Sequence, residues 1–189
     1  TGTASPLLIV IAGPSGVGKD SVLARMRELG KPYHFTVTAT TRRQRESERD
    51  GTDYIFKTTE QFRRMIDREE LLEWAEVYGN LYGVPRSQVK RALSEGADVI
   101  IKTDVQGAAT IRKLVPEAVF IFLAPPSMEE LAYRLGQRMT ESREALEQRL
   151  LTAEAEMCEA SKFDHVVTNY RDRLDDTVRD MEAIVDRER

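Results

Sequence analysis

Cysteine, tryptophan and histidine are nearly absent from this chain of 189 residues, which contains one cysteine (Cys158), one tryptophan and two histidines. A single cysteine excludes an intrachain disulfide and fits a reducing compartment, so we expect a cytoplasmic location. No spacing of cysteine and histidine predicts a structural zinc site.

Long apolar runs are also lacking. No stretch approaches the roughly 20 apolar residues that a membrane helix needs, and the run at 7–12 is too short for a signal peptide. We therefore expect no membrane partner. The net charge of −4 argues against broad binding of nucleic acid. A hydrophobic content of 41% at this length predicts a soluble globular chain with a single domain over 1–189.

Short apolar runs alternate with helical patterns along the chain. The composition of buried parallel strands occurs at 7–12, 98–102 and 119–123. Further strands are expected at 35–41, 54–56, 71–77 and 164–169, and helices at 19–29, 59–69, 86–95, 106–114, 174–186 and over much of 127–162. The polar stretch 42–52 and the glycine-punctuated stretch after residue 77 are interpreted as loops. Alternating strands and helices predict an α/β fold with a parallel sheet covered on both faces.

The sequence GPSGVGK follows the first apolar run and precedes a helix. Gly-x4-Gly-Lys in this context is typical of a phosphate-binding loop, because glycines let backbone N–H groups surround phosphate oxygens and the helix N-terminus adds partial positive charge. Lys19 supplies a full charge for the terminal phosphates. A glycine-rich turn without a ligand is the weaker alternative. The residues expected at a triphosphate are Gly13, Pro14, Ser15, Gly16, Val17, Gly18, Lys19, Asp20 and Ser21.

Asp20 departs from the usual loop, in which the residue after the lysine offers a hydroxyl to Mg²⁺. Ser21 lies one residue further, about 100° around a helix, and cannot simply replace that hydroxyl. Two interpretations of Asp20 stay open. It is a first-turn carboxylate favoured by the helix dipole, or it meets Mg²⁺ directly or through water.

Two further groups of polar residues are candidates for anion and metal binding. Arg42 and Arg45 are three residues apart and could grip one anionic group, with Tyr54 adding a phenol. On charge alone, a solvated loop explains these arginines equally well, because acidic residues lie nearby. Asp104 follows the apolar run 98–102, where a carboxylate can hold Mg²⁺ through water or cap the next helix.

Six stretches in this order resemble the guanylate kinase family. They are GPSGVGK, TTRRQRESERDGTDYIF, LLEWAEVYGNLYG, DVQGAATIR, IFLAPPSMEEL and RLGQRMTESREALEQRL. The resemblance covers nearly the whole chain and implies a P-loop nucleoside monophosphate kinase fold: a three-layer core (about 7–34, 97–126 and 163–189), a small GMP-binding subdomain (about 35–96) and a mobile helical lid (about 127–162). It also implies Mg²⁺-dependent transfer of the terminal phosphoryl group of ATP to GMP and dGMP.

The resemblance assigns roles position by position. Glu73 would accept hydrogen bonds from guanine N1–H and the amino group, and Thr38 would meet guanine O6 in place of the more usual serine. Asn169 would lie at the adenine of ATP. The GMP-binding set is Thr38, Arg42, Arg45, Tyr54, Glu73, Tyr82, Lys102 and Asp104. The arginines of the lid, which close over the phosphates, are Arg134, Arg138 and Arg149. The catalytic set is Lys19, Arg42, Arg138 and Arg149, and the Mg²⁺ set is Asp20, Ser21 and Asp104, mostly through water.

Two positions depart from the family pattern. Lys102 stands where many relatives carry an Asp that helps to bind the guanine amino group, and Val84 replaces a frequent hydroxyl residue.

Two alternative functions stay open. The string GKDS resembles the loop of ribose bisphosphate kinases, but Glu73 and Thr38 argue against a sugar-phosphate acceptor. A non-catalytic guanylate-kinase-like module that binds phosphopeptides is the other alternative, and the intact Lys19 argues against it.

Overall fold

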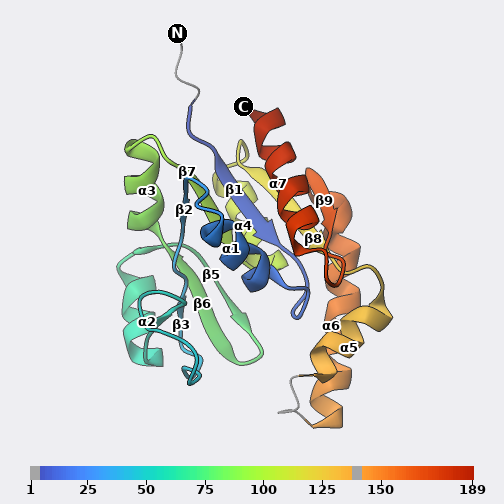
Figure 1. Ribbon diagram of the computed structural model, residues 1–189. Coiled ribbons are helices and arrows are strands. Elements are labelled where there is room, and N and C mark those ends of the chain that lie inside the picture. The colour runs from blue at the N-terminus through green and yellow to red at the C-terminus, as the bar shows by residue number, and fades with distance from the viewer. Residues whose placement is uncertain (1–4, 138–141) are drawn as a thin grey trace.

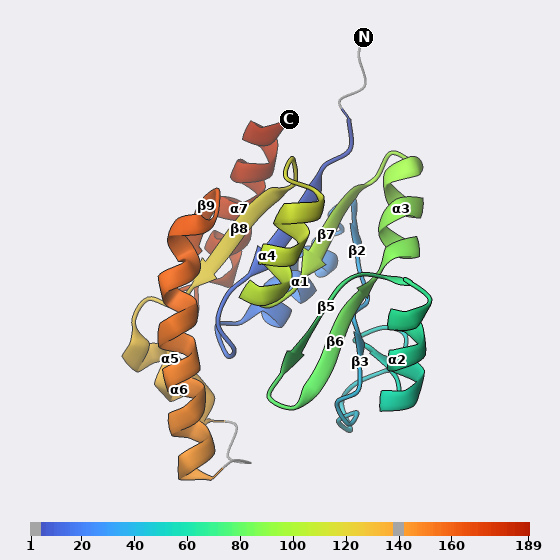
Figure 2. The same cartoon turned by 180° about the vertical axis from the view of Figure 1, so that it is seen from behind.

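Five parallel strands form the central sheet of the computed structural model, which describes residues 5–137 and 142–189. Their order is β2 (Tyr33–Phe35), β7 (Asp98–Lys102), β1 (Leu8–Ala12), β8 (Val119–Ala124) and β9 (His165–Thr168). Helices α1 (Lys19–Glu28) and α7 (Leu174–Glu188) cover one face, and α3 (Arg86–Ser94) and α4 (Val105–Leu114) cover the other (Figure 1, Figure 2). The predicted α/β fold with a helix-covered parallel sheet is confirmed.

The central strand β1 divides its side chains between two apolar cores. Ile9 and Ile11 pack in the core beneath α1 and α7, whereas Leu8, Val10 and Ala12 pack in the core beneath α3 and α4. Alternation of this kind follows from the two-residue period of a strand. Because both faces are covered, β1 contains no polar residue and is recognisable in the sequence as a continuous apolar run.

A smaller mixed sheet lies beside the core. Its strand order is β4 (Ile55–Phe56), β3 (Ala39–Thr40), β6 (Asn80–Pro85) and β5 (Leu71–Val77). Helix α2 (Thr59–Asp67) begins with a capping box formed by Thr58 and Gln61. From this helix Phe62, fully buried, packs into a small core that also contains Ala39 and Leu71.

The prediction of one strand over 35–41 is wrong. The chain leaves the central sheet after Phe35 and enters the small sheet at Ala39, so two short strands replace one. Thr36 N still donates to Ile100 O of the central sheet at 3.0 Å, while Thr38 O accepts from Ile55 N of the small sheet at 2.9 Å. The alternating pattern continues through the crossing, and it therefore carries no signal for the change of sheet.

The loop expected after residue 77 is also wrong, because β6 occupies most of it. Tyr78 and Gly79 have positive φ values of 49° and 77° and form a two-residue turn between β5 and β6. Gly83 lies within β6, where a Cβ would approach the Leu71 side chain to 2.9 Å. Its role is close packing in a strand, which a pattern based on turn residues does not distinguish from a loop.

Helices α5 (Met128–Gly136) and α6 (Arg143–Cys158) and the short helix η1 (Glu159–Lys162) account for the helical stretch expected over 127–162. In Figure 1, the carboxyl end of β1 lies between the β5–β6 hairpin and α6.

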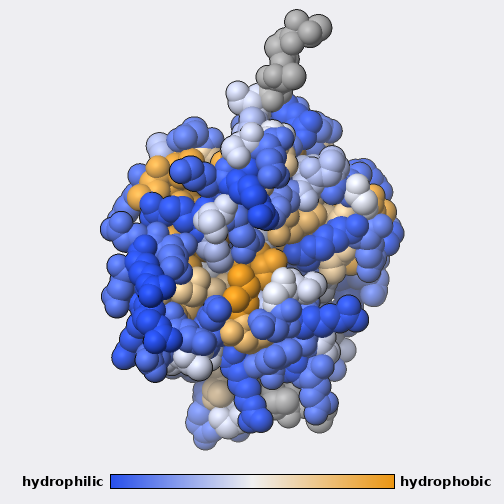
Figure 3. Space-filling view, turned by 90° about the vertical axis from the view of Figure 1, so that its left-hand side faces the viewer, coloured by the Kyte–Doolittle hydropathy of each residue, from blue (hydrophilic) through white to orange (hydrophobic). Residues whose placement is uncertain are grey.

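Most of the face that contains α2 and α3 is hydrophilic, with a small hydrophobic area near its middle (Figure 3). Within the described parts of the chain, no helix has the length and apolar character to cross a membrane.

Candidate active site

The loop between β1 and α1 needs glycine at two positions, Gly13 and Gly18, where a side chain would not fit. Gly18 has a φ of 102°, in the left-handed region, and a Cβ there would lie 2.6 Å from Asn169 Nδ2. A Cβ on Gly13 would lie 2.3 Å from the carbonyl oxygen of Leu123. The loop is therefore packed tightly against β8 and the residue after β9, and its other side borders a pocket.

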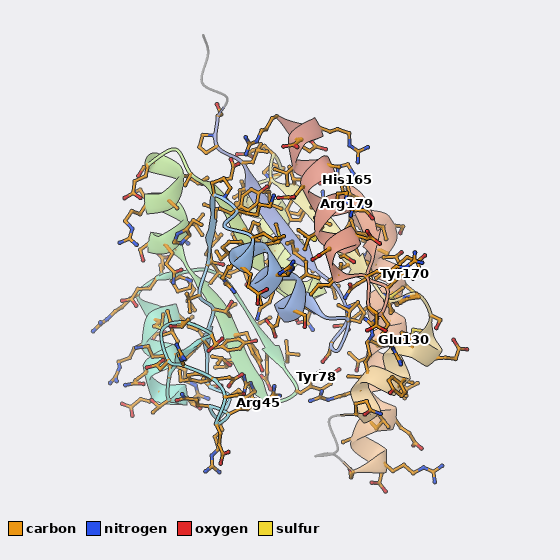
Figure 4. All side chains as sticks on the ribbon, viewed as in Figure 1. Arg45, Tyr78, Glu130, His165, Tyr170 and Arg179 are labelled. Carbon is orange, nitrogen blue, oxygen red and sulfur yellow. The ribbon has the colours of Figure 1, made fainter. Side chains whose placement is uncertain are left out.

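This pocket has a volume of about 510 Å³ and lies at the carboxyl ends of β1 and β7, where open α/β sheets bind ligands. The predicted triphosphate residues that line it are Gly13, Ser15, Gly16, Gly18, Lys19, Asp20, Ser21, Arg134 and Asn169. The predicted acceptor residues that line it are Thr38, Arg42, Arg45, Tyr54, Glu73, Tyr82, Lys102 and Asp104, joined by Arg149 of α6. Figure 4 shows Arg45 and Tyr78 on one side and Tyr170 on the other. The carbonyl oxygens of Pro14 and Val17 accept hydrogen bonds from Lys19 and Arg134. Arg138 lies outside the described residues.

Lys19 lies over the loop, and its surroundings lower its pKa. Its Nζ donates to the carbonyl oxygens of Gly13 at 2.5 Å and Pro14 at 3.2 Å. Burial lowers the pKa of Lys19 to about 8, while the nearby carboxylate of Glu156 opposes that change and the ammonium of Lys102 adds to it. A phosphate group in the loop would stabilise the ammonium and raise this pKa again, so the site favours an anionic ligand.

Glu156 is a site residue that the sequence did not reveal. Its carboxyl group extends from α6 into the pocket, and Oε2 has no hydrogen-bond partner among the described residues. Burial raises the pKa of Glu156, whereas Lys19 and the backbone amide of Ser15 act in the opposite direction. In the sequence it is one acidic residue on a strongly charged helix, and only the fold distinguishes it from its neighbours.

Arg134 and Asn169 hold the phosphate-binding loop through hydrogen bonds to its backbone. Both side chains donate to the carbonyl oxygen of Val17, each at 2.9 Å. The Asn169 side-chain oxygen accepts from Thr177 Oγ1 at 2.9 Å, and Arg134 also pairs with Glu130 at 2.9 Å. These contacts give both residues a positioning role, while contact of Asn169 with an adenine ring stays a prediction.

One oxygen of a buried carboxyl group and a buried hydroxyl lie on the acceptor side of the pocket without protein partners among the described residues. Among the described residues, Thr38 Oγ1 and Glu73 Oε2 make no hydrogen bond, and both side chains are almost fully buried. Glu73 Oε1 accepts from Thr103 Oγ1 at 3.3 Å. Burial, assisted by the charge of Asp104, raises the pKa of Glu73 to about 8. Unpaired buried polar atoms facing a pocket indicate a polar ligand that completes them.

Gly107 leaves the space that Glu73 occupies, which gives a test of this packing. A Cβ on Gly107 would lie 2.0 Å from Thr103 Oγ1 and 2.7 Å from Glu73 Oε2. We expect Gly107→Ala to lower the free energy of unfolding in urea by about 2 kcal/mol. The control Gly136→Ala, whose Cβ meets nothing within 4 Å, should change it by less than about 1 kcal/mol. Equal losses in the two variants would contradict this account of Gly107.

The arginine-rich loop is fixed by Glu48. Arg42 Nη2 lies 2.6 Å from Glu48 Oε1, and the backbone amide of Arg45 donates to Glu48 Oε2 at 2.9 Å. Burial alone would raise the pKa of Glu48, but these hydrogen bonds lower it overall. Arg42 also lies over the Tyr54 ring, 5.1 Å from its centroid. Arg42 is therefore held in place at the pocket, which disfavours the interpretation of a freely solvated loop.

The residues after β7 connect the two sides of the pocket. Asp104 Oδ1 accepts from Gly107 N at 2.8 Å and caps α4, as the sequence allowed. Lys102 Nζ donates to Asp20 Oδ1 at 2.5 Å and to Tyr54 Oη at 2.9 Å. Burial alone would lower the pKa of Lys102, but Asp20 and Tyr54 raise it above its ordinary value, so the side chain stays an ammonium.

Helix α6 reaches the hairpin on the opposite side of the pocket. The Arg149 guanidinium lies over the Tyr78 ring, 4.9 Å from its centroid. Tyr78 stands at the tip of the β5–β6 hairpin, on the side that faces α6 (Figure 4). The pocket is therefore spanned by a contact between the helical segment and the small sheet.

A parallel sheet whose central strand leads into a Gly-x4-Gly-Lys loop and a helix defines a P-loop nucleotide-binding protein. The separate acceptor side, with Arg42 held by Glu48 and the unpaired Oε2 of Glu73, is what a P-loop phosphotransferase needs for a second substrate.

Comparisons identify the family. A family model described as guanylate kinase matches residues 5–188, and the chain belongs to this family. It is 45% identical over 185 residues to guanylate kinase 2, chloroplastic/mitochondrial, of Oryza sativa subsp. japonica, covering 97% of this chain and 65% of that protein. It is 44% identical to the guanylate kinase of Shouchella clausii, covering 95% of this chain and 86% of that protein. The crystal structure of guanylate kinase from Anaplasma phagocytophilum matches with a TM-score of 0.79 and 30% identity, covering 98% of this chain and 87% of that one.

Proposed function

We propose that this protein transfers the terminal phosphoryl group of ATP to GMP, forming ADP and GDP. The observation that carries the proposal is the pair of unpaired buried groups, Thr38 Oγ1 and Glu73 Oε2, in the same pocket as Lys19. Guanine presents two adjacent donors, N1–H and the amino group, beside the acceptor O6. A carboxylate and a hydroxyl match this edge, whereas adenine lacks the two adjacent donors and would leave Glu73 unsatisfied.

Positioning and electrostatics supply the catalysis, because phosphoryl transfer between nucleotides needs no protein nucleophile. In this proposal Lys19 and the loop hold the phosphates of ATP, and Arg149 approaches the transferring group from α6. The phosphate of GMP is held by Arg42, Arg45, Tyr54 and Tyr82. The small sheet forms the GMP-binding part, residues 127–162 form the lid, and the contact between Arg149 and Tyr78 supports closure of one over the other.

The pocket suits Mg²⁺ held largely by phosphate and water. Asp20, Ser21 and Asp104 line it and offer hard oxygen donors. Across residues 5–137 and 142–189, no group of three or more acidic, histidine or cysteine side chains could hold a metal ion by itself. When bound, Mg²⁺ would neutralise charge on the phosphates. We further propose that the protein acts on free nucleotides in the cytoplasm and accepts dGMP, since the assigned contacts read the base and the phosphate.

An assay of ADP release tests the acceptor directly. With ATP and Mg²⁺ present, we expect rapid turnover with GMP, measurable turnover with dGMP and little with AMP or ribose 1,5-bisphosphate. Turnover with ribose 1,5-bisphosphate and none with GMP would assign the chain to the sugar-phosphate kinases. Absence of turnover with every acceptor would favour a binding module.

Binding of GMP should release a proton. At neutral pH the free protein carries a proton on Glu73, whose pKa of about 8 reflects burial and the charge of Asp104. Guanine donors require the ionised carboxylate, so GMP binding expels that proton and the affinity rises with pH up to about 8. Calorimetry in buffers of different ionisation enthalpy should give release of about one proton per GMP. Proton release that is unchanged in Glu73→Gln would contradict this assignment.

A further inference from the structure

The two positions at which the active centre departs most from the expected pattern are in contact. Asp20 stands where a phosphate-binding loop usually offers a hydroxyl, and Lys102 stands where many relatives carry an Asp. The Lys102 ammonium lies 2.5 Å from Asp20 Oδ1, although 82 residues separate them in the chain. The carboxylate of α1 and the cation at the end of β7 therefore form one ion pair.

The Lys102 ammonium also lies between the binding regions of the two substrates. Asp20 follows Lys19 in the first turn of α1, on the triphosphate side. Tyr54, on the acceptor side, accepts from Lys102 Nζ at 2.9 Å and lies beneath Arg42. The Nζ is 4.4 Å from the centroid of the Tyr54 ring. A phosphate group that reaches Arg42 and Tyr54 therefore comes within reach of Lys102.

The two members of this pair differ in their exposure to solvent. The Lys102 side chain is 15% exposed, whereas the Asp20 side chain is 73% exposed. The ammonium is therefore held between Tyr54 and Asp20 in a mostly buried place, whereas the carboxylate is already largely exposed to water. An anion with stronger hydrogen-bond acceptors, such as a phosphate dianion, can take the place of Asp20 at Lys102.

We propose that Lys102 is an additional binding group for the phosphate of the acceptor, and that Asp20 occupies it until that phosphate arrives. The inference rests on the proposed function, in which the acceptor is GMP. Once displaced, Asp20 is available as one of the oxygen donors assigned to the hydrated metal ion. Asp20 thus neutralises the buried ammonium of Lys102 in the free protein and leaves it to the phosphate when the acceptor binds.

Opposite effects of the two partners on GMP binding distinguish this role from a merely structural ion pair. Calorimetric titration with GMP, without ATP or Mg²⁺, is done on the wild type, Asp20→Asn, Lys102→Met and the double variant. Lys102→Met should raise the Kd for GMP about tenfold or more, because a charge-assisted hydrogen bond is lost. Asp20→Asn should lower the Kd about threefold, because a competitor is removed. In the double variant most of that gain should disappear.

Controls separate this result from damage to the fold. Lys31 forms an ion pair with Glu182 at 2.8 Å, away from the pocket, so Lys31→Met should leave the Kd unchanged. Lys102→Arg should retain most of the affinity, and thermal unfolding of each variant shows whether it is folded. Equal Kd values for Lys102→Met and the wild type, or weaker binding by Asp20→Asn, would overturn the proposal. If the wild type neither binds nor phosphorylates GMP, the proposed function fails instead, and titration of the same variants with inorganic pyrophosphate still tests the pair.

Discussion

Replacement of Lys19 with methionine is expected to lower kcat for phosphoryl transfer about a thousandfold while making the free protein more stable. The loss arises because the Lys19 ammonium is the charge that the loop offers to the transferring phosphate. The gain arises because burial lowers the pKa of Lys19 to about 8, so the charged form is disfavoured in the folded protein. Methionine fills a similar volume without that penalty.

The sign of the stability change depends on pH in a defined way. A lysine whose folded-state pKa falls from 10.5 to about 8 destabilises the fold fully below about 8 and hardly at all above 10.5. Lys19→Met should therefore raise the free energy of unfolding by about 1 kcal/mol at neutral pH and by less at alkaline pH. Steady-state kinetics and urea denaturation measure the two effects.

A matched control is Lys90→Met on α3, where the side chain is exposed and remote from the pocket. It should change neither kcat nor stability appreciably. Wild-type kcat in Lys19→Met would contradict the assignment of this lysine. A loss of kcat accompanied by an unfolded protein would show that the lysine is structural.

Replacement of Glu73 with glutamine is expected to lower kcat/KM for GMP about a thousandfold or more, with little change in the KM for ATP. The glutamine amide would turn a donor toward a donor of guanine, and the lost acceptor cannot be replaced by water inside a buried site. The effect is confined to the acceptor, because Glu73 lies on β5 and the phosphate-binding loop lies on the other side of the pocket.

The free energy of unfolding of Glu73→Gln shows whether the loss of activity comes from a damaged fold. A carboxyl group whose folded-state pKa rises from 4.5 to about 8 favours the fold fully below about pH 4.5 and loses that advantage progressively as the pH rises to about 8. Glu73→Gln should therefore make the free protein more stable at and above pH 8, by about 2 kcal/mol. Denaturant titrations at low and high pH measure this difference.

Glu76→Gln provides the matched control on the same strand, since Glu76 is exposed. This variant should keep wild-type kcat/KM for GMP at every pH. Equal losses in Glu73→Gln and Glu76→Gln would show that the effect is not specific to the buried carboxyl group.

Local features explain how much of this site could be predicted from the sequence. The phosphate-binding loop is encoded in seven consecutive residues, and the strand before it is fully buried, so motif and context coincide. Asp104 caps the helix that begins at the next residue, which is equally local. The resemblance brought Glu73 and Thr38 into consideration, and the burial of Glu73 Oε2 and Thr38 Oγ1 without partners supports a ligand at both positions.

Other features had no signal in the sequence pattern. Glu48 fixes Arg42, yet its neighbour Glu46 has the same charge and a similar context. The charge of Glu156 reaches Lys19 only because α6 passes beside the loop. The contact between Lys102 and Asp20 joins two departures that appeared unrelated in the sequence. The change of sheet between Phe35 and Ala39 was missed because strand alternation continues across it.

Phosphorus NMR of ATP and GMP incubated with Mg²⁺ and a catalytic amount of the protein follows the transfer of the phosphoryl group itself. We expect the signal of the GMP phosphate to decay while the two signals of GDP and those of ADP grow together, with no inorganic phosphate. The same mixture with AMP in place of GMP should stay unchanged. ATP converted to ADP and inorganic phosphate without GDP, or phosphoryl transfer to AMP as fast as to GMP, would contradict the proposed function.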